Sequence, residues 1–503
     1  MELSLGVDRP VLIVAVLVIG AVLTAALASR PGSRFRVPGA LLFLGIGMAV
    51  GDEGLGLIQV DDAALVRDIG VVALLVILFE GGLTTKPTDL RIAAIPGILL
   101  STVGVVVTAA ITGVGVWLLF DVDVITAALL GSVVASTDAA AVFSMMRTTP
   151  MPRRVSALLR IESGANDPIA VMLTVGLVAI ADGAASGAGE WATFAAMQLG
   201  GGMVLGGVVG LAGVWVLRNV GLGVEGLYPV FAAAIGAAAY GVAANLGASG
   251  FVAVYVAGLA IGAFVPRHRR AVLGFHEVMA NAAEVGLFLM LGLLVFPSRL
   301  LQVDVAVPAL AVAGILVAVA RPAAIAVCVT WFRVDLREQA LLNWAGLRGA
   351  VPIVLATFPF TAGIDGGQTI FDVVFFVVLL SVLLQGSTLL PFVRLLGLER
   401  PVSAWSPVAE ALPLAGGDVD VVELVVSPDL AIAGVRLRDT PALPDAIVAA
   451  VLRGNHTLVP TGDTELRPGD VLLLTSARKG DAAARITAWA RGEAPGGTAT
   501  APR

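Results

Sequence analysis

Long apolar stretches separated by short polar segments recur along the chain from Pro10 to Leu398. Each is close to the ~20 residues that an α-helix needs to cross the hydrocarbon core of a bilayer. The pattern predicts thirteen spans, at residues 10–29, 37–51, 69–84, 92–120, 123–146, 155–182, 194–217, 228–246, 249–266, 275–296, 304–332, 338–359 and 369–396. Residues 1–398 therefore read as an all-α polytopic membrane protein.

The basic residues support this count and predict an orientation. With the N-terminus outside, the outer segments hold only Arg9, Arg67 and Arg299. The inner segments hold Arg30, Arg34, Arg36, Lys86, Arg91, Arg147, Arg153, Arg154, Arg160, Arg218, Arg267, Arg269, Arg270, Arg333, Arg337, Arg394 and Arg400. Because lysine and arginine favour cytoplasmic loops, we expect the C-terminus in the cytoplasm and the protein in a bacterial cytoplasmic (inner) membrane.

The composition excludes several classes. Apolar residues make up 58% of the 503 and charged residues 14%, with a mean hydropathy of +0.96, whereas a soluble chain carries about 25% charge. Cys328 is the only cysteine, so a disulfide within the chain is excluded. Lys86 and Lys479 are the only lysines, and neither lies in a G-x-x-x-x-G-K-[ST] motif, which excludes a P-loop ATPase site in this chain.

The character of the chain changes after Leu398. Residues 399–418 are rich in proline, alanine and glycine and are typical of a linker. VVELVVS, HTLVP and DVLLLTS then predict short β-strands, and PALPDAIVAAVLRG between them could hold a short helix. We expect a small cytoplasmic α+β domain at 419–490, followed by a disordered tail at 491–503.

Ionisable side chains lie inside the sixth span, in RIESGANDPIAVML. Glu162 and Asn166 are four residues apart, as are Ser163 and Asp167, so their oxygen atoms fall on adjoining parts of one helix face. Pro168 also lacks an N–H, so a backbone carbonyl one turn earlier loses its helical partner. Charged groups at bilayer depth are costly and usually mark an ion pathway. Hard oxygen ligands suit an alkali cation.

Two other spans have polar or small residues at their centres. The fifth contains Ser136, Thr137 and Asp138, and the twelfth contains Arg348 between glycines. Such sequences are typical of the paired broken helices that meet at the midplane of many transporters. From the layout, spans 4–6 and 11–13 are candidates for two inverted repeats.

Other readings stay open for some of these groups. Asp138 serves either as an ion ligand or as the cap of a broken helix end, and Glu162 either binds the ion or neutralises an arginine. For Glu80 and Glu284 we expect interhelical hydrogen bonds. We assign no chemistry to the histidines, His268, His276 and His456.

Five stretches together resemble the cation:proton antiporters of the NhaP/Na⁺–H⁺ exchanger branch. They are LFEGGL, STDAAAVF, ESGANDP, Arg321-Pro322 and GLRGAVPIVLAT. The resemblance implies an NhaA/NhaP-like dimer with thirteen transmembrane helices, two of them broken and crossing, a dimerisation domain and a six-helix core. It places the ion site on Asp167, with Thr137, Asp138, Glu162, Ser163 and Asn166 around it. It also implies an arginine partner for Glu162, with Arg321 as our first choice and Arg348 as the second.

The soluble segment resembles the TrkA-C (RCK_C) module. Antiporters of this branch that carry the module resemble the bacterial potassium/proton antiporters. The module commonly dimerises, which implies a homodimer through both domains, and binds small regulators such as cyclic di-AMP. A preceding nucleotide-binding half is not expected, since no G-x-G-x-x-G follows a strand in the sequence.

The sequence therefore predicts a secondary antiporter and not an enzyme. Asp167 would bind H⁺ and a monovalent cation in turn, and one titrating carboxylate beside Asn166 favours electroneutral 1:1 exchange. K⁺ is favoured over Na⁺ or Li⁺ through the C-terminal module alone. A ligand-gated cation channel is the remote alternative, without a TVGYG-type filter to support it. We expect no cofactor and no nucleic-acid partner.

Overall fold

The computed structural model divides the chain into two compact units, a helical one ending at Leu398 and a second one built on Glu399–Arg503. It describes Ile19 and residues 39–58, 62–85, 87–138, 142–143, 151–181, 188–264, 268–399, 408–413, 419–443, 445–454, 456–477 and 482–492. The first predicted span, 10–29, lies outside these residues except for Ile19. The same holds for the predicted tail beyond residue 492.

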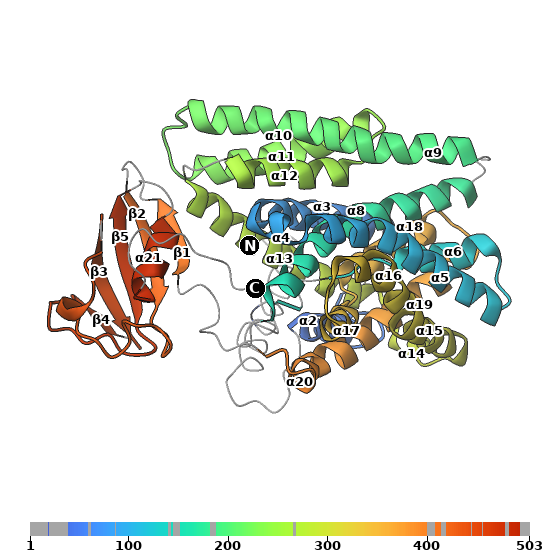
Figure 1. The fold of residues 1–503 in the computed structure, drawn as a ribbon. Helices are drawn as coiled ribbons and strands as arrows, with labels where there is room; N and C mark the ends of the chain where they lie inside the picture. The colour runs from blue at the N-terminus through green and yellow to red at the C-terminus, as the bar shows by residue number, and fades with distance from the viewer. Residues whose placement is uncertain are drawn as a thin grey trace, which may run out of the picture. The chain divides into compact units, whose positions relative to one another are not determined.

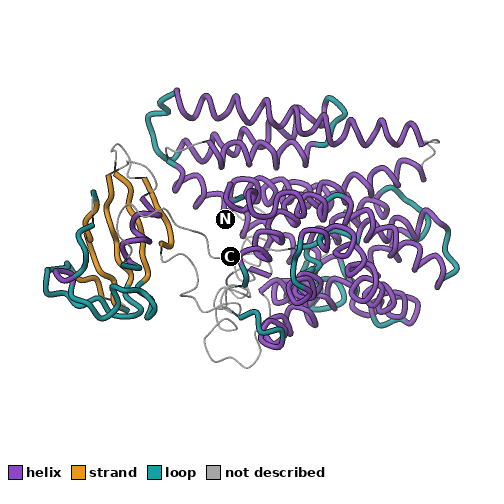
Figure 2. The backbone as a smooth tube through the Cα atoms, in the orientation of Figure 1, coloured by secondary structure: helices purple, strands orange, loops and turns teal. Residues whose placement is uncertain are grey.

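In the described residues, each predicted span from the second onward coincides with one helix or with a run of consecutive helices (Figures 1 and 2). The first half of the unit contains α2 (Gly39–Val50), α3 (Ala63–Thr84), α4 (Pro87–Ser101), α5 (Val103–Leu119), α6 (Val124–Val133) and α8 (Arg153–Ala181). The next helices are α9 (Ala188–Ala196), η1 (Met197–Gly201), α10 (Gly202–Asn219), α11 (Leu227–Asn245), α12 (Gly250–Phe264) and α13 (Arg269–Leu294). The last are α14 (Pro297–Leu300), α15 (Val303–Ile315), η2 (Leu316–Ala320), α16 (Arg321–Cys328), η3 (Thr330–Phe332), α17 (Leu336–Trp344), α18 (Ala350–Thr361), α19 (Gly367–Ser381), η4 (Val382–Gly386) and α20 (Ser387–Leu395).

Seven helices of the described part are long and apolar enough to cross a bilayer, and four shorter ones are apolar. The protein is therefore a multi-pass membrane protein, as predicted. The exact number of thirteen spans stays a prediction, because the first of them is not among the described residues.

Both predicted broken helices are present. Helix α6 ends at Val133 and residues 134–138 are not helical, while α17 ends at Trp344 and α18 begins only at Ala350. The two non-helical segments touch, because the backbone N–H of Asp138 donates to the carbonyl of Leu347 over 2.8 Å. This approach requires a small residue, since a Cβ at Gly349 would overlap the Asp138 carboxylate. Backbone groups released from both helices thus meet inside the membrane part.

The second unit contains a five-stranded antiparallel sheet with the order β1-β2-β5-β3-β4 (Figure 1). Its strands are β1 (Val408–Pro413), β2 (Val419–Val425), β3 (Ala446–Arg453), β4 (His456–Leu458) and β5 (Val471–Ala477), with a 3-10 turn, η6 (Leu437–Asp439), and helix α21 (Ala482–Ala490). Alternate apolar residues of the strands and one face of α21 form the core, which includes Val422, Leu424, Val451, Leu472, Leu474, Ile486 and Trp489.

Two details of the predicted C-terminal region are wrong. The predicted linker 399–418 contains a strand, β1, which pairs with β2. The stretch in which we allowed a short helix forms β3, which pairs with β5 on one side and β4 on the other. Its alanines suit a helix, but Ile447, Val448 and Val451 suit a strand. The neighbouring strands supply the backbone hydrogen bonds that decide between the two.

Candidate ion-binding site

Helix α8 brings the predicted site residues to the interior of the membrane part. It runs without interruption through Pro168, which leaves the carbonyl of Gly164 without its usual N–H partner. Asn166 is fully buried, and Glu162 and Asp167 are only 1% and 6% exposed. Ser163 is half-buried on the same helix. The i, i+4 spacing therefore places the polar groups in the protein and not toward lipid.

Thr137 connects the non-helical end of α6 to α8. Its hydroxyl donates to Glu162 Oε1 over 3.2 Å and accepts a hydrogen bond from Asn166 Nδ2 over 2.6 Å. Asn166 Nδ2 also lies 3.3 Å from the Thr137 carbonyl oxygen. The Oδ1 atom of Asn166 is buried and has no hydrogen-bond partner among the residues that the structure describes. The asparagine thus offers an oxygen to a ligand while its nitrogen holds Thr137.

Glu162 forms a buried ion pair with Arg321, the first of the two partners that we expected. Both guanidinium Nη atoms donate to the carboxylate, Nη1 to Oε1 and Nη2 to Oε2, the latter over 2.8 Å. The two side chains are 2% and 5% exposed. Arg321 also donates to the carbonyl of Leu342 over 3.3 Å. The charge of Glu162 is neutralised in this way, as expected under the prediction that Glu162 pairs with an arginine.

Arg348, the second candidate partner for Glu162, binds backbone carbonyls instead. Its Nη1 donates to the carbonyls of Ala135 and Ser136, over 2.8 and 2.6 Å, and its backbone N–H donates to Ser381 Oγ over 3.1 Å. These carbonyls are free because α6 has ended at Val133. Arg348 therefore holds one broken helix against the other.

Asp167 is the unsatisfied carboxylate of the site. Its Oδ1 is buried and has no hydrogen-bond partner in the described part of the chain. The Asp138 carboxyl group lies close enough to interact with it electrostatically. A buried carboxylate without partners requires either a proton or a cation. With the oxygens of Thr137 and Asn166 nearby, the ligands are hard and suit an alkali cation.

Glu80 and Glu284 are the two acidic residues for which we predicted interhelical hydrogen bonds. Neither side chain makes the predicted interhelical hydrogen bond to the residues that the structure describes. Instead, Glu284 of α13 interacts electrostatically with both Asp138 and Glu80 of α3, and Glu80 also interacts with Glu277 and Arg160. The acidic environment of the site therefore extends to α3 and α13, which short motifs could not reveal.

Comparisons with known proteins identify the families that the two parts of the chain match. Residues 18–395 match the family described as sodium/hydrogen exchanger, transmembrane, and residues 421–486 match the TrkA-C domain.

Two bacterial relatives and one solved structure are similar to the chain. The K⁺/H⁺ antiporter NhaP2 of Shewanella oneidensis is 39% identical over 471 residues, which cover 92% of this chain and 81% of the relative. The K⁺/H⁺ antiporter NhaP of Alkalimonas amylolytica is 38% identical over 418 residues, which cover 82% and 71%. The structure of the sodium proton antiporter MjNhaP1 from Methanocaldococcus jannaschii superposes with a TM-score of 0.63 at 22% identity, covering 74% of this chain and 98% of that one.

Proposed function

The chain belongs to the sodium/hydrogen exchanger family, and we propose that it exchanges K⁺ for H⁺ across the cytoplasmic membrane of a bacterium, with Asp167 as the carrier. The observation that carries the proposal is the buried Oδ1 of Asp167, which has no partner among the described residues. The names of the two bacterial relatives support K⁺ as the cation.

The mechanism is competition at one carboxylate. Asp167 is neutral as the protonated acid and is again neutralised when a monovalent cation binds its ionised form. In each loaded state the core carries no extra charge through the low-dielectric interior, where an unpaired charge is costly. The state in which Asp167 is ionised and has bound no cation is the unfavourable one. The helical core therefore crosses between its two orientations only with a proton or a cation on Asp167, which couples the two fluxes.

The surrounding groups favour one proton against one cation. Glu162 has its charge balanced by Arg321, through bonds to both carboxylate oxygens. Asn166 supplies an amide beside Asp167 and not a second titrating group. Electroneutral 1:1 exchange follows if Asp138 keeps its protonation state during the cycle.

Exchange of Na⁺ or Li⁺ for H⁺ is the second candidate. Hydroxyl, amide and carboxylate oxygens bind all alkali cations, so the proposed ligands on α8 and on the segment after α6 do not discriminate between K⁺, Na⁺ and Li⁺. The TrkA-C match at residues 421–486 supports the proposed preference for K⁺ only by analogy with potassium/proton antiporters that carry this module.

The remaining parts of the proposal concern the whole assembly. We place the N-terminus outside and the TrkA-C domain in the cytoplasm, on the distribution of basic residues. We also propose a homodimer and control of exchange by a small ligand of the C-terminal domain, for which cyclic di-AMP is the first compound to test.

The test uses purified full-length protein in proteoliposomes that contain a pH-sensitive dye. An outward K⁺ gradient should drive proton uptake, with Na⁺, Li⁺ and added cyclic di-AMP compared in turn. Asp167→Asn should abolish exchange. Asp372→Asn is the matched control, because Asp372 is also an intramembrane aspartate, 3% exposed, but lies in α19 beside Gln368 and not in the site.

Three results would contradict the proposal. Exchange retained by Asp167→Asn would exclude Asp167 as carrier, and a cation current without proton coupling would indicate a channel. Exchange with Na⁺ but none with K⁺ would reverse the cation preference while leaving the carrier role of Asp167 intact.

A further inference from the structure

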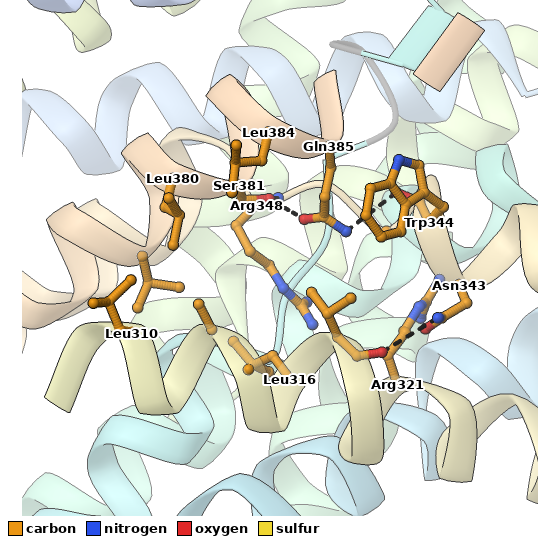
Figure 3. A pocket seen from close by; sticks show the side chains of 15 residues that line it. Leu310, Leu316, Arg321, Asn343, Trp344, Arg348, Leu380, Ser381, Leu384 and Gln385 are labelled. Atoms are coloured by element: carbon orange, nitrogen blue, oxygen red, sulfur yellow. Dashed lines mark hydrogen bonds between the residues drawn. The ribbon is translucent and has the colours of Figure 1, made fainter. Parts of the chain in front are cut away.

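A cavity of about 290 Å³ lies inside the membrane part, apart from the oxygen atoms of the ion site (Figure 3). One wall comes from α15 and η2, the opposite wall from α19 and η4, and the segment between α17 and α18 closes it. Leu310 and Leu384 line it and are 53% and 55% exposed. The cavity therefore reaches the apolar outer surface of the helices, where lipid chains lie.

Both walls contain an irregular turn at the cavity. Helix α15 continues directly into the π-helical turn η2, and helix α19 continues directly into the π-helical turn η4. Leu316 and Val317 of the first turn and Leu384 and Gln385 of the second are lining residues. Single π-turns inside helices occur frequently at functional sites. Two of them facing one cavity indicate that the space is a built feature.

Arg348 lines this cavity, and its side chain extends from beside Ser381 toward the wall that contains Leu316 (Figure 3). The residue is 3% exposed. Both protons of Nη1 are used by backbone carbonyls. The Nε and Nη2 donors have no partner in the described part of the chain, and no described carboxylate lies within 4.0 Å of the guanidinium. Three of its five N–H donors are thus available.

The other polar groups of the cavity do not balance that charge. Arg321 is neutralised by Glu162, and Ser381 donates to Gln385 Oε1 over 2.6 Å. Asn343 is uncharged, and its Nδ2 donates to the carbonyl of Val317 over 3.2 Å. Most of the remaining lining is apolar, including Leu310, Val377 and Leu380. A buried guanidinium is costly unless an anion or acceptor satisfies it. The cavity therefore combines one cationic end with apolar walls that open toward lipid.

We propose that this cavity binds a single-chain anionic amphiphile, a long-chain fatty acid. Its carboxylate would accept hydrogen bonds from Arg348 Nε and Nη2 in the planar arrangement that guanidinium and carboxylate favour. Its alkyl chain would lie against Leu310, Leu316 and Leu384 and continue into the bilayer. The occupant comes from the membrane, because the walls that it must pass are apolar.

A fatty acid also meets the energetic demand of entry. In its protonated form it is uncharged and crosses apolar surface at low cost, whereas a phospholipid headgroup carries a permanent charge. Beside the Arg348 guanidinium the ionised form is favoured, so the acid loses its proton to water as the ion pair forms. The cavity is at the lower end of the size of ligand pockets, about 300–1,000 Å³, which suits one chain better than two.

Trp344 lines the cavity and provides the readout. Full-length protein in nanodiscs is titrated with dibromostearic acid, whose bromines quench nearby tryptophan, and with its methyl ester, which has the same chain but no charge. The signal of Trp344 is the difference between the wild type and Trp344→Phe. The free acid should quench Trp344 at a concentration at least about tenfold lower than the ester does.

Two variants test the two ends of the site. Arg348→Gln should remove the preference for the acid over the ester. Gly314→Phe should reduce quenching of Trp344 by both compounds, since Gly314 lines the cavity and nothing lies within 4 Å of a Cβ there. Gly207→Phe on α10 is the matched control, because a Cβ at Gly207 also meets open space, and it should quench like the wild type.

Equal quenching by acid and ester in the wild type would overturn the proposal, because ordinary lipid chains would then explain it. An unchanged preference in Arg348→Gln would overturn it as well. If that variant fails to fold, the acid-to-ester ratio and the Gly314→Phe result still decide. Binding is measured without any ion gradient, so the result is independent of the proposed exchange.

Discussion

Arg321 contacts both carboxylate oxygens of Glu162, and the pair joins the start of α16 to the middle of α8. Thr137 adds a hydrogen bond to the same carboxylate from the broken end of α6. Two helices, α8 and α16, and the non-helical segment after α6 are thus held together close to Asp167. Asp167, the proposed carrier, thus lies beside a rigid support, while its own Oδ1 has no hydrogen-bond partner among the described residues.

Breaking this pair on one side should destabilise the protein strongly. Arg321→Met leaves the Glu162 carboxylate buried without its counter-charge, which typically costs about 3–5 kcal/mol. We expect a marked fall in the melting temperature in detergent, measured by intrinsic fluorescence. The double variant Glu162→Leu with Arg321→Met should recover much of that loss. Comparable stability of the single and double variants would show that the pair is not a stabilising unit.

The hydroxyl of Thr137 should matter more than its methyl group. Thr137→Val removes an acceptor for Asn166 and a donor to Glu162, and leaving buried polar groups unsatisfied costs about 1–3 kcal/mol. We therefore expect reduced stability and slower cation exchange in proteoliposomes. Thr137→Ser keeps the hydroxyl and is the matched control, which should retain most of the exchange rate. Similar rates for both variants would exclude the proposed role of the hydroxyl.

The sequence was sufficient for the parts of the fold that depend on local pattern. Apolar runs of membrane length located the helices, and glycines beside polar residues located the break between α17 and α18. The face of α8 with Glu162, Asn166 and Asp167 followed from the four-residue period. In β3 the local signals conflicted, and only pairing with β4 and β5 decided the outcome.

What the sequence did not reveal depends on contacts between distant helices. Arg348 binds carbonyls that become free only because α6 ends early. No residue type marks such acceptors in advance. Likewise, Glu284 of α13 interacts electrostatically with Asp138, which is about 150 residues earlier in the chain, and the apolar period of α13 carries no information about that neighbour.

Gly164 should tolerate no side chain, although it lies in an uninterrupted helix. A Cβ there would come within 2.7 Å of the Tyr255 hydroxyl oxygen on α12, and Tyr255 is 8% exposed, with little space to move. We expect Gly164→Ala to lower the melting temperature and slow exchange. Gly207→Ala on α10 is the control, since its Cβ meets nothing within 4 Å.

A double-mutant cycle with Tyr255→Leu tests this contact directly. If Tyr255 is the obstacle, the cost of Gly164→Ala should fall in the Tyr255→Leu background, with a coupling free energy of about 0.5–3 kcal/mol. Strictly additive effects would mean that the alanine acts through another contact.

In the C-terminal domain, Asp470 should stabilise the fold at neutral pH. Arg453 donates to both its oxygens over 2.8 Å, and the Arg467 backbone N–H donates over 2.9 Å. These hydrogen bonds, that from Arg453 first, lower the pKa of Asp470 below 3.8. Because the folded state favours the ionised form, the stabilisation is present above pH 3.8 and is lost as the pH falls through the folded pKa.

Asp470→Asn should thus reduce the free energy of opening of the C-terminal domain by about 1–3 kcal/mol. The measurement is hydrogen exchange of β5 in the full-length protein, with equal losses at pH 7 and pH 5. A loss that appears only at pH 5, or none at either, would contradict this role.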